Sequence, residues 1–73
     1  MNEGSVLLLS ALALGELLDV SRRHIYRLKS AGKLPRPVRV GASLRWRKEH
    51  INQWIEWGCP EQKIFEAKWE GRK

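Results

Sequence analysis

The chain has 73 residues, enough for one domain with a small core, since folding at this size hides only about 60% of the unfolded chain's surface. Its 14 lysines and arginines against 8 acids give a formal net charge of +6. So short a chain can hardly supply the supporting layers of a deep catalytic cleft, and we expect no enzyme. The positive charge favours binding of an extended polyanion instead.

The cysteine content and one apolar run indicate the cellular compartment of the protein. Cys59 is the only cysteine, so no internal disulfide can form, which fits a reducing cytoplasm. The run Val6–Gly15 has the length of a signal-peptide core, but Glu3 precedes it without any lysine or arginine. The run is also too short to span a membrane. We therefore expect a cytoplasmic protein without membrane contact.

The first predicted elements are a lead-in and a helix. Residues 1–9 form the N-terminal lead-in, which is apolar from Val6 to Leu9. Ser10 has the position of a helix N-cap, whose hydroxyl accepts a hydrogen bond from a free backbone amide. The helix that follows carries Leu14, Leu17 and Leu18 on one face. An internal glycine weakens this helix.

A second helix is predicted from Arg22 to Ala31. Ser21 is its N-cap, and Gly32 follows in the position where a left-handed residue commonly ends a helix. Only about three residues, 19–21, separate the two helices, and that length forces the sharp turn of a helix-turn-helix.

Two prolines then hold the chain extended, and a hairpin is predicted next. Its strands, residues 38–40 and 44–46, alternate apolar with basic side chains, and residues 41–43 supply a three-residue loop. In that arrangement Arg39 and Arg45 project from the same side, so one face packs and the other is cationic.

The third helix is predicted from Glu49 to Trp57, where Ile51, Trp54 and Ile55 have the spacing of an amphipathic helix. It closes a domain that we expect to span residues 10–58.

A C-terminal tail, residues 59–73, is expected to be helical between Glu61 and Glu70, with Phe65 and Trp69 one turn apart. Three roles stay open for this tail: packing against the domain, a dimer contact, or binding of a protein partner. The predicted fold class is mainly α with a small β-hairpin, a winged helix-turn-helix in the order helix, helix, two-stranded wing, helix and C-terminal helix.

The positive charge is concentrated on the second helix and the wing. No acid occurs between Asp19 and Glu49, and that window holds 10 of the 14 basic residues. Arg22 and Arg23 are the expected base readers, because arginine donates two parallel hydrogen bonds to guanine. Tyr26 and Arg27 are better placed for phosphates, while Ile25, Leu28 and Ala31 form the packed face. The candidate DNA-binding residues are Ser21, Arg22, Arg23, Tyr26, Arg27, Lys29, Arg39, Ser43, Arg45 and Arg47.

The remaining chemistry-bearing side chains indicate no active site. Trp46 alternates with arginines in its strand, so we place it in the core rather than stacked on a base. His24, His50 and Cys59 match no zinc spacing, and no catalytic triad or carboxylate pair is present. His24 is expected near the buried edge of its helix. We expect no catalytic residue, metal or cofactor.

Four motifs follow one another along the chain: V-S-R-R at the start of the second helix, G-K-L-P after it, V-R-V-G in the wing and L-R-W-R in the return strand. In this order, from about Leu8 to Pro60, they resemble the AlpA/excisionase branch of the MerR-like winged helix-turn-helix proteins. The resemblance implies a second helix in the major groove and a wing on the neighbouring minor groove or backbone. It carries the DNA-contact role onto Ser21, Arg22, Arg23, Tyr26, Arg27, Arg39 and Arg45. Lys48 departs from the family, which often caps its third helix with serine, aspartate or threonine.

The resemblance implies an excisionase that directs an integrase or recombinase of a phage or mobile element, or an AlpA-like transcriptional regulator. Cooperative self-association on double-stranded DNA would accompany either role, and no small-molecule effector is expected. The alternative is an adaptor whose Phe65/Trp69 stripe recruits a protein partner such as an integrase, with DNA binding secondary. RNA binding is a less favoured hypothesis, because the A-form major groove does not admit such a helix.

Overall fold

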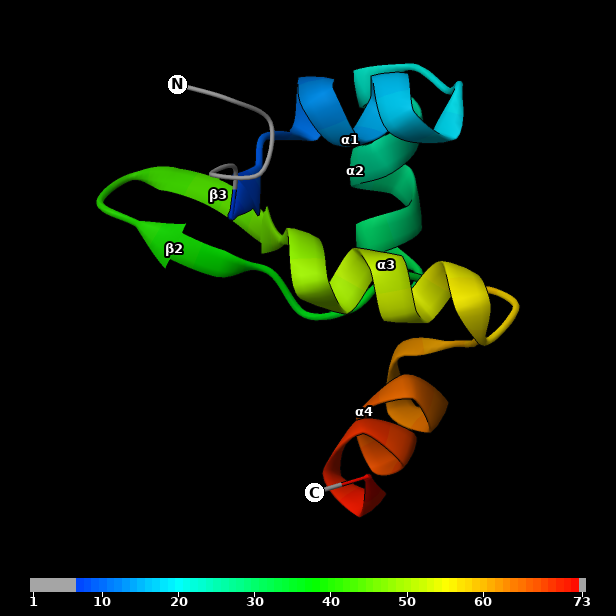
Figure 1. Cartoon of the computed structure of the whole chain (residues 1–73). Helices are drawn as coiled ribbons and strands as arrows, with labels where there is room; N and C mark the ends of the chain where they lie inside the picture. Colours follow the sequence, from blue (N-terminus) through cyan, green and yellow to red (C-terminus); the bar gives the residue numbers. More distant parts are fainter. Residues whose placement is uncertain (1–6, 73) are drawn as a thin grey trace.

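The computed structural model describes residues 7–72. Residues 1–6 of the predicted lead-in and Lys73 of the predicted tail lie outside the described residues. The elements are β1 (Leu8–Leu9), α1 (Ala11–Leu18), α2 (Arg22–Ser30), β2 (Val38–Val40), β3 (Ser43–Arg47), α3 (Lys48–Glu56) and α4 (Gln62–Gly71). Figure 1 shows the β2–β3 hairpin reaching away from the helices to one side. The predicted class, mainly α with a small sheet in winged helix-turn-helix order, is confirmed.

Both predicted N-caps are confirmed. Oγ of Ser10 accepts a hydrogen bond of 3.0 Å from the backbone amide of Ala13. Oγ of Ser21 accepts one of 3.1 Å from the amide of His24. Each bond satisfies an amide that the first turn of a helix leaves without an intrahelical partner. The two caps therefore define where α1 and α2 begin.

The turn between α1 and α2 depends on Gly15. A Cβ atom at this position would lie 2.6 Å from the carbonyl oxygen of Val20, and the Val20 amide donates a 2.8 Å hydrogen bond to the Gly15 carbonyl. Asp19 adopts a left-handed conformation, with φ of 61°, that reverses the chain. The glycine that weakens α1 as a helix is thus needed where the start of α2 approaches α1 closely.

The turn of the hairpin is shorter than predicted. Instead of a loop over residues 41–43, it contains only Gly41 and Ala42, and Ser43 already pairs with Val40. Gly41 has φ of +62°, and glycine at the first central position is what a type II′ two-residue hairpin turn requires. We call β2, this turn and β3 the wing.

The shorter turn moves the strand register by one residue. Arg39 pairs with Leu44, and Arg45 pairs with Val38. Directly paired side chains share a face and successive ones alternate, so Arg39 lies on the face of Leu44 and Trp46, and Arg45 lies on the other. The prediction that Arg39 and Arg45 project from the same side is therefore wrong.

The apolar lead-in forms a third strand that was not predicted. In β1, Leu8 pairs with Arg47 and Leu9 pairs with Trp46, which gives the sheet order β1-β3-β2. Because β1 has only two residues, no alternating pattern is long enough to reveal it. The strand places Leu9 over the core beside Trp46.

The core lies between α1, α2, β3, α3 and α4. Its buried apolar side chains are Leu9, Ala11, Leu14, Ile25, Leu34, Trp46, Ile51, Trp54 and Phe65. The prediction that Trp46 packs in the core is confirmed, since the side chain is 0% exposed. Its Nε1 donates a 3.1 Å hydrogen bond to the carbonyl oxygen of Pro35, so the only polar atom of the ring is satisfied.

The packed faces of the helices are narrower than predicted. Leu17 of α1 is 50% exposed, Ile55 of α3 is 42% exposed, and Ala31 beyond α2 is also exposed. These three placements correct the sequence analysis. In a domain this small, each helix contacts the core along one narrow row, so residues at the margin of an apolar stripe remain in solvent.

The C-terminal helix packs against the rest of the domain. Phe65 is 2% exposed and belongs to the core, where its ring centroid lies 5.5 Å from that of Trp57. Nε1 of Trp54 donates a 2.8 Å hydrogen bond to the carbonyl of Pro60, which fixes the approach to α4. Of the three roles that the sequence left open for the tail, packing against the domain is the one that these contacts support. Within the described residues, no helix combines the length and the apolar character needed to cross a membrane.

Candidate nucleic-acid interface

Helix α2 presents a basic surface to solvent. Ile25 is buried and Leu28 is partly buried against the core, while Arg22, Arg23 and Arg27 are exposed. The helix therefore packs against the core along one side and exposes polar side chains along the other. Positions 23 and 27 lie opposite the buried Ile25 on a helical wheel, so their side chains point away from this anchor in the core.

The other predicted residues of α2 occupy its flanks and ends. Ser21 caps the helix through Oγ, and Lys29 lies in the last turn, where a cation suits the negative end of the helix dipole. Tyr26 is exposed one turn after Arg22, on the same side of the helix. His24 was expected near a buried edge but is exposed, which corrects that expectation.

A hollow of about 560 Å³ separates α2 from the wing, and we call it the wing hollow. Arg22 and Tyr26 line it from α2, and Ser10 to Leu12 line it from the start of α1. The wing contributes Arg39, Ser43 and Arg45, among other residues. The structure therefore gathers five of the ten predicted site residues around one hollow that opens between two elements.

Two wing arginines reach this hollow from different faces. Arg39 is exposed and lies on the face of the wing that also carries Leu44 and Trp46. Arg45 is partly buried, and its Nη1 donates a 2.7 Å hydrogen bond to the carbonyl oxygen of Leu44. That bond holds the Arg45 guanidinium against its own strand.

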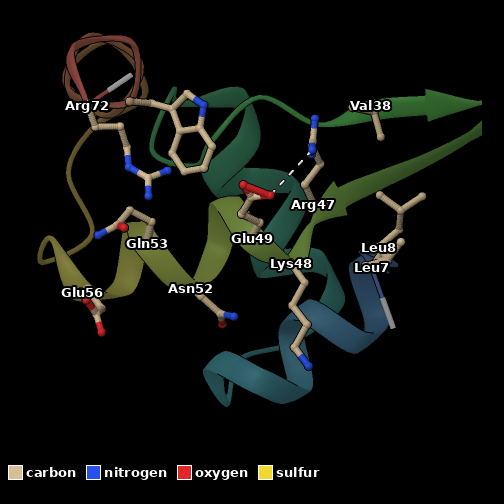
Figure 2. Close-up of a pocket in the computed structure, with 11 residues that line it drawn as sticks. Leu7, Leu8, Val38, Arg47, Lys48, Glu49, Asn52, Gln53, Glu56 and Arg72 are labelled. Atoms are coloured by element: carbon tan, nitrogen blue, oxygen red, sulfur yellow. Dashed lines mark ion pairs between the residues drawn. The ribbon is translucent and has the colours of Figure 1, made fainter. Parts of the chain in front are cut away.

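Arg47 lies apart from the other predicted residues. Figure 2 shows its side chain turned toward Glu49 of α3, and its Nη2 lies 3.8 Å from Oε1 of that carboxylate. The two residues line a different hollow, of about 840 Å³, together with Leu8, Lys48 and Glu56, among others. The structure does not bring Arg47 to the wing hollow, because it follows Arg45 by two residues and lies where β3 passes into α3.

Two other basic residues of the acid-free window form ion pairs with acids of α4 and of the residue just before it. Nζ of Lys33 lies 2.9 Å from Oε2 of Glu61, and Nε of Arg36 lies 3.1 Å from Oε2 of Glu66. The hydrogen bond from Lys33 and the charge of its ammonium group lower the pKa of Glu61 below its ordinary value. Exposed pairs like these add little stability, but they leave the positive field centred on α2 and the wing.

Sequence reasoning missed the contribution of α1 to this surface. Ser10 was recognised as a cap, but nothing in the sequence indicated that Ala11 and Leu12 border the wing hollow. Their position depends on the strand β1, which sets where α1 begins relative to β3. A short strand of this kind leaves no pattern, so the signal was absent.

The residues with metal-binding or nucleophilic side chains do not assemble. Over residues 7–72, no group of three or more histidines, cysteines, aspartates or glutamates could hold a metal ion. Cys59 is an exposed free thiol, and His50 packs its ring edge-on against Trp69 with a centroid distance of 4.5 Å.

A basic helix that follows a tight interhelical turn, with a hairpin beside it, defines the winged helix-turn-helix class of DNA-binding domains. A comparison with family models assigns the chain to a family: it belongs to the family described as helix-turn-helix domain, whose model matches residues 9–56. These are small DNA-binding domains, and the family includes excisionase-like proteins. Searches of curated proteins and of solved structures found no match. The chain is therefore a helix-turn-helix protein whose ligand is double-stranded DNA.

Proposed function

We propose that the protein binds short duplex sites sequence-specifically, as an excisionase or as an AlpA-like transcriptional regulator of a phage or mobile element. Helix α2 enters the major groove, and the wing contacts the adjoining backbone or minor groove. The observation that carries this proposal is the basic surface that α2 and the wing share, while acids of α4 neutralise Lys33 and Arg36 elsewhere.

The dimensions and chemistry of α2 fit the major groove. One helix fills that groove, and its outermost side chains then meet base edges. Arg23 and Arg27 occupy the outermost positions of α2, with Ile25 anchoring the opposite side in the core. Recognition of a defined sequence follows from a rigid helix whose arginines have fixed positions.

The biological role is proposed from the resemblance described above and from the family, which includes excisionase-like proteins. An excisionase bends DNA to assemble a recombination complex with an integrase, whereas a regulator acts at a promoter. Proteins of the kind that the chain resembles often bind several adjacent sites, which is why cooperative self-association is part of the proposal. Cys59 is a free thiol, which fits action on DNA in the cytoplasm.

The adaptor role has less support. It requires the Phe65/Trp69 stripe at the surface, but Phe65 is 2% exposed, with its ring centroid 5.7 Å from that of Trp69. The stripe therefore packs largely within the protein, which favours DNA binding as the main role.

Selection of bound fragments from random duplexes tests the proposed function. We expect enrichment of one short site, often in adjacent copies, and the positions of that site relative to attachment sites and promoters separate excision from regulation. The affinity should fall steeply with salt, because each neutralised phosphate releases a counterion. A duplex RNA competitor should displace little DNA. Absence of any salt-sensitive affinity for duplex DNA would contradict the proposal.

A further inference from the structure

The wing hollow differs in charge from the other hollows described on this surface. Glu49 and Glu56 help line the hollow of about 840 Å³, and Glu66 and Glu70 help line another of about 510 Å³. The residues that line the wing hollow include three arginines and no acid. Of these three sites, the wing hollow alone offers an environment suited to an anion.

None of the three arginines of the wing hollow forms an ion pair within the described residues, although Arg45 donates one hydrogen bond to the carbonyl oxygen of Leu44. The ion pairs of the described residues join Lys33, Arg36 and Arg47 to glutamates, and none of them includes an arginine of the wing hollow. Arg22 and Arg39 are also exposed, so their guanidinium groups are accessible to a ligand. Three like charges around one hollow repel each other, and an anion between them relieves that repulsion.

The start of α1 adds to the same field. Ser10 caps one amide of the first turn, and the positive end of the helix dipole faces the hollow where Ala11 and Leu12 line it. The first turn of α1 contains no acidic side chain that would oppose an anion.

The two rows of polar side chains on α2 face different surroundings. Arg22 and Tyr26, four residues apart, both line the wing hollow. Arg23 and Arg27 form the neighbouring row, which does not line that hollow and points away from the core. The helix therefore has one row directed toward the wing and one directed outward.

We infer that the wing hollow seats a phosphodiester of the DNA backbone, held jointly by Arg22 of α2 and Arg39 of the wing. Arg22 is then a backbone-contact residue, and base reading is left to Arg23 in the outer row. One phosphate shared by α2 and the wing fixes the register of both elements on the same stretch of duplex. This inference rests on the proposed function, because it assigns a specific ligand group to part of that interface.

The test is a scan in which single phosphates of the selected duplex are replaced by uncharged methylphosphonates. We expect one position per bound protein at which neutralisation weakens wild-type binding by about tenfold. In Arg22→Ala and in Arg39→Ala, affinity for the unmodified duplex falls, and the same neutralisation then has less than about a threefold further effect. Each variant also has a salt slope smaller by about one.

Two control variants sharpen the result. Arg23→Ala should keep the full penalty of the methylphosphonate, because its side chain is directed to bases. Arg72→Ala removes an arginine that stacks on Trp69, 4.5 Å from the ring centroid, and should leave duplex affinity unchanged. The inference is overturned if duplex binding persists but no methylphosphonate penalty depends on Arg22 and Arg39. A protein without duplex affinity would overturn the proposed function first, and this inference with it.

Discussion

The backbone amide of Gln62, the first residue of α4, donates a 2.9 Å hydrogen bond to the carbonyl oxygen of Gly32, just after α2. Gly32 has φ of +70°, so the chain turns there in a conformation that glycine adopts without strain. Lys33 and Glu61 form their ion pair beside this bond. The start of the C-terminal helix is thus tied by its backbone to the turn that follows α2.

Replacing Phe65 with alanine should lower the free energy of unfolding by about 3–5 kcal/mol, because the ring is fully packed between α3 and α4. Such a loss is a large share of the stability of a small domain. The adjacent Ile64 is 51% exposed, and Ile64→Ala should cost less than about 0.5 kcal/mol. Chemical denaturation followed by tryptophan fluorescence measures both. Equal losses in the two variants would show that α4 does not dock in solution as described.

Gly15→Ala should destabilise the protein even though alanine favours helix. The added Cβ would meet the carbonyl oxygen of Val20 at 2.6 Å, and this backbone atom cannot move without shifting the start of α2. We expect a loss of about 1–3 kcal/mol, measured by thermal denaturation. A Cβ added at Gly71 in α4 would meet no neighbouring atom within 4 Å, so Gly71→Ala should be neutral or stabilise by up to about 1 kcal/mol. If both substitutions stabilised the protein, the close α1–α2 approach would be wrong.

Local side-chain chemistry made the helices predictable. Ser10 and Ser21 cap α1 and α2 as expected, because a hydroxyl at that position has one nearby partner, the backbone amide three residues on. Trp46 was placed correctly for a similar reason, since its alternation with arginines left only one side for the core. Predictions of this kind depend on neighbours in the sequence.

The prediction for the wing was wrong in its strand register. Three residues, 41–43, and two residues, Gly41 and Ala42, are both reasonable hairpin loops, and the choice between them inverts which face each arginine occupies. Arg39 therefore came to the side of Leu44 rather than that of Arg45. No local pattern decides between the two registers, because each strand of the wing alternates apolar with basic side chains and this alternation fits either one.

Long-range pairing was the other feature that the sequence could not supply. The acids that neutralise Lys33 and Arg36 lie 28 and 30 residues farther along the chain, on a helix whose docking the apolar pattern left open. The basic window accordingly overstated the charge near the turn after α2. Once Lys33 and Arg36 are paired, the remaining basic residues of the window lie mainly on α2 and the wing.

Arg23→Ala should reduce the discrimination between the selected duplex and a random duplex by about 1–3 kcal/mol, because an arginine in the outer row of α2 loses its paired contacts to a guanine. Arg45→Ala should weaken binding to both duplexes more evenly, as expected for a backbone contact from the wing. Competition titrations with the two duplexes measure each ratio. A similar loss on both duplexes for Arg23→Ala would contradict its role in base reading.

His50 should make stability depend on pH. Its ring packs against Trp69 and Phe65, and its buried Nδ1 has no hydrogen-bond partner among residues 7–72. Burial, followed by the charge of Arg47, lowers the pKa of His50 below its ordinary value of 6.5, while Glu49 and Glu66 oppose this shift. The folded protein thus takes up the proton less readily than the unfolded chain. The contribution of neutral His50 to stability is therefore fully present above the ordinary pKa. It is lost progressively as the pH falls through that value toward the lower pKa of the folded state.

Denaturation midpoints measured between about pH 7.5 and 5.5 should therefore fall with pH in the wild type and fall less in His50→Gln, whose side chain does not titrate. The comparison uses the slope with pH, because glutamine also changes the packing against Trp69 and shifts stability at every pH. If His50→Gln and the wild type showed the same slope, the packed position of His50 would not be the cause of the pH dependence.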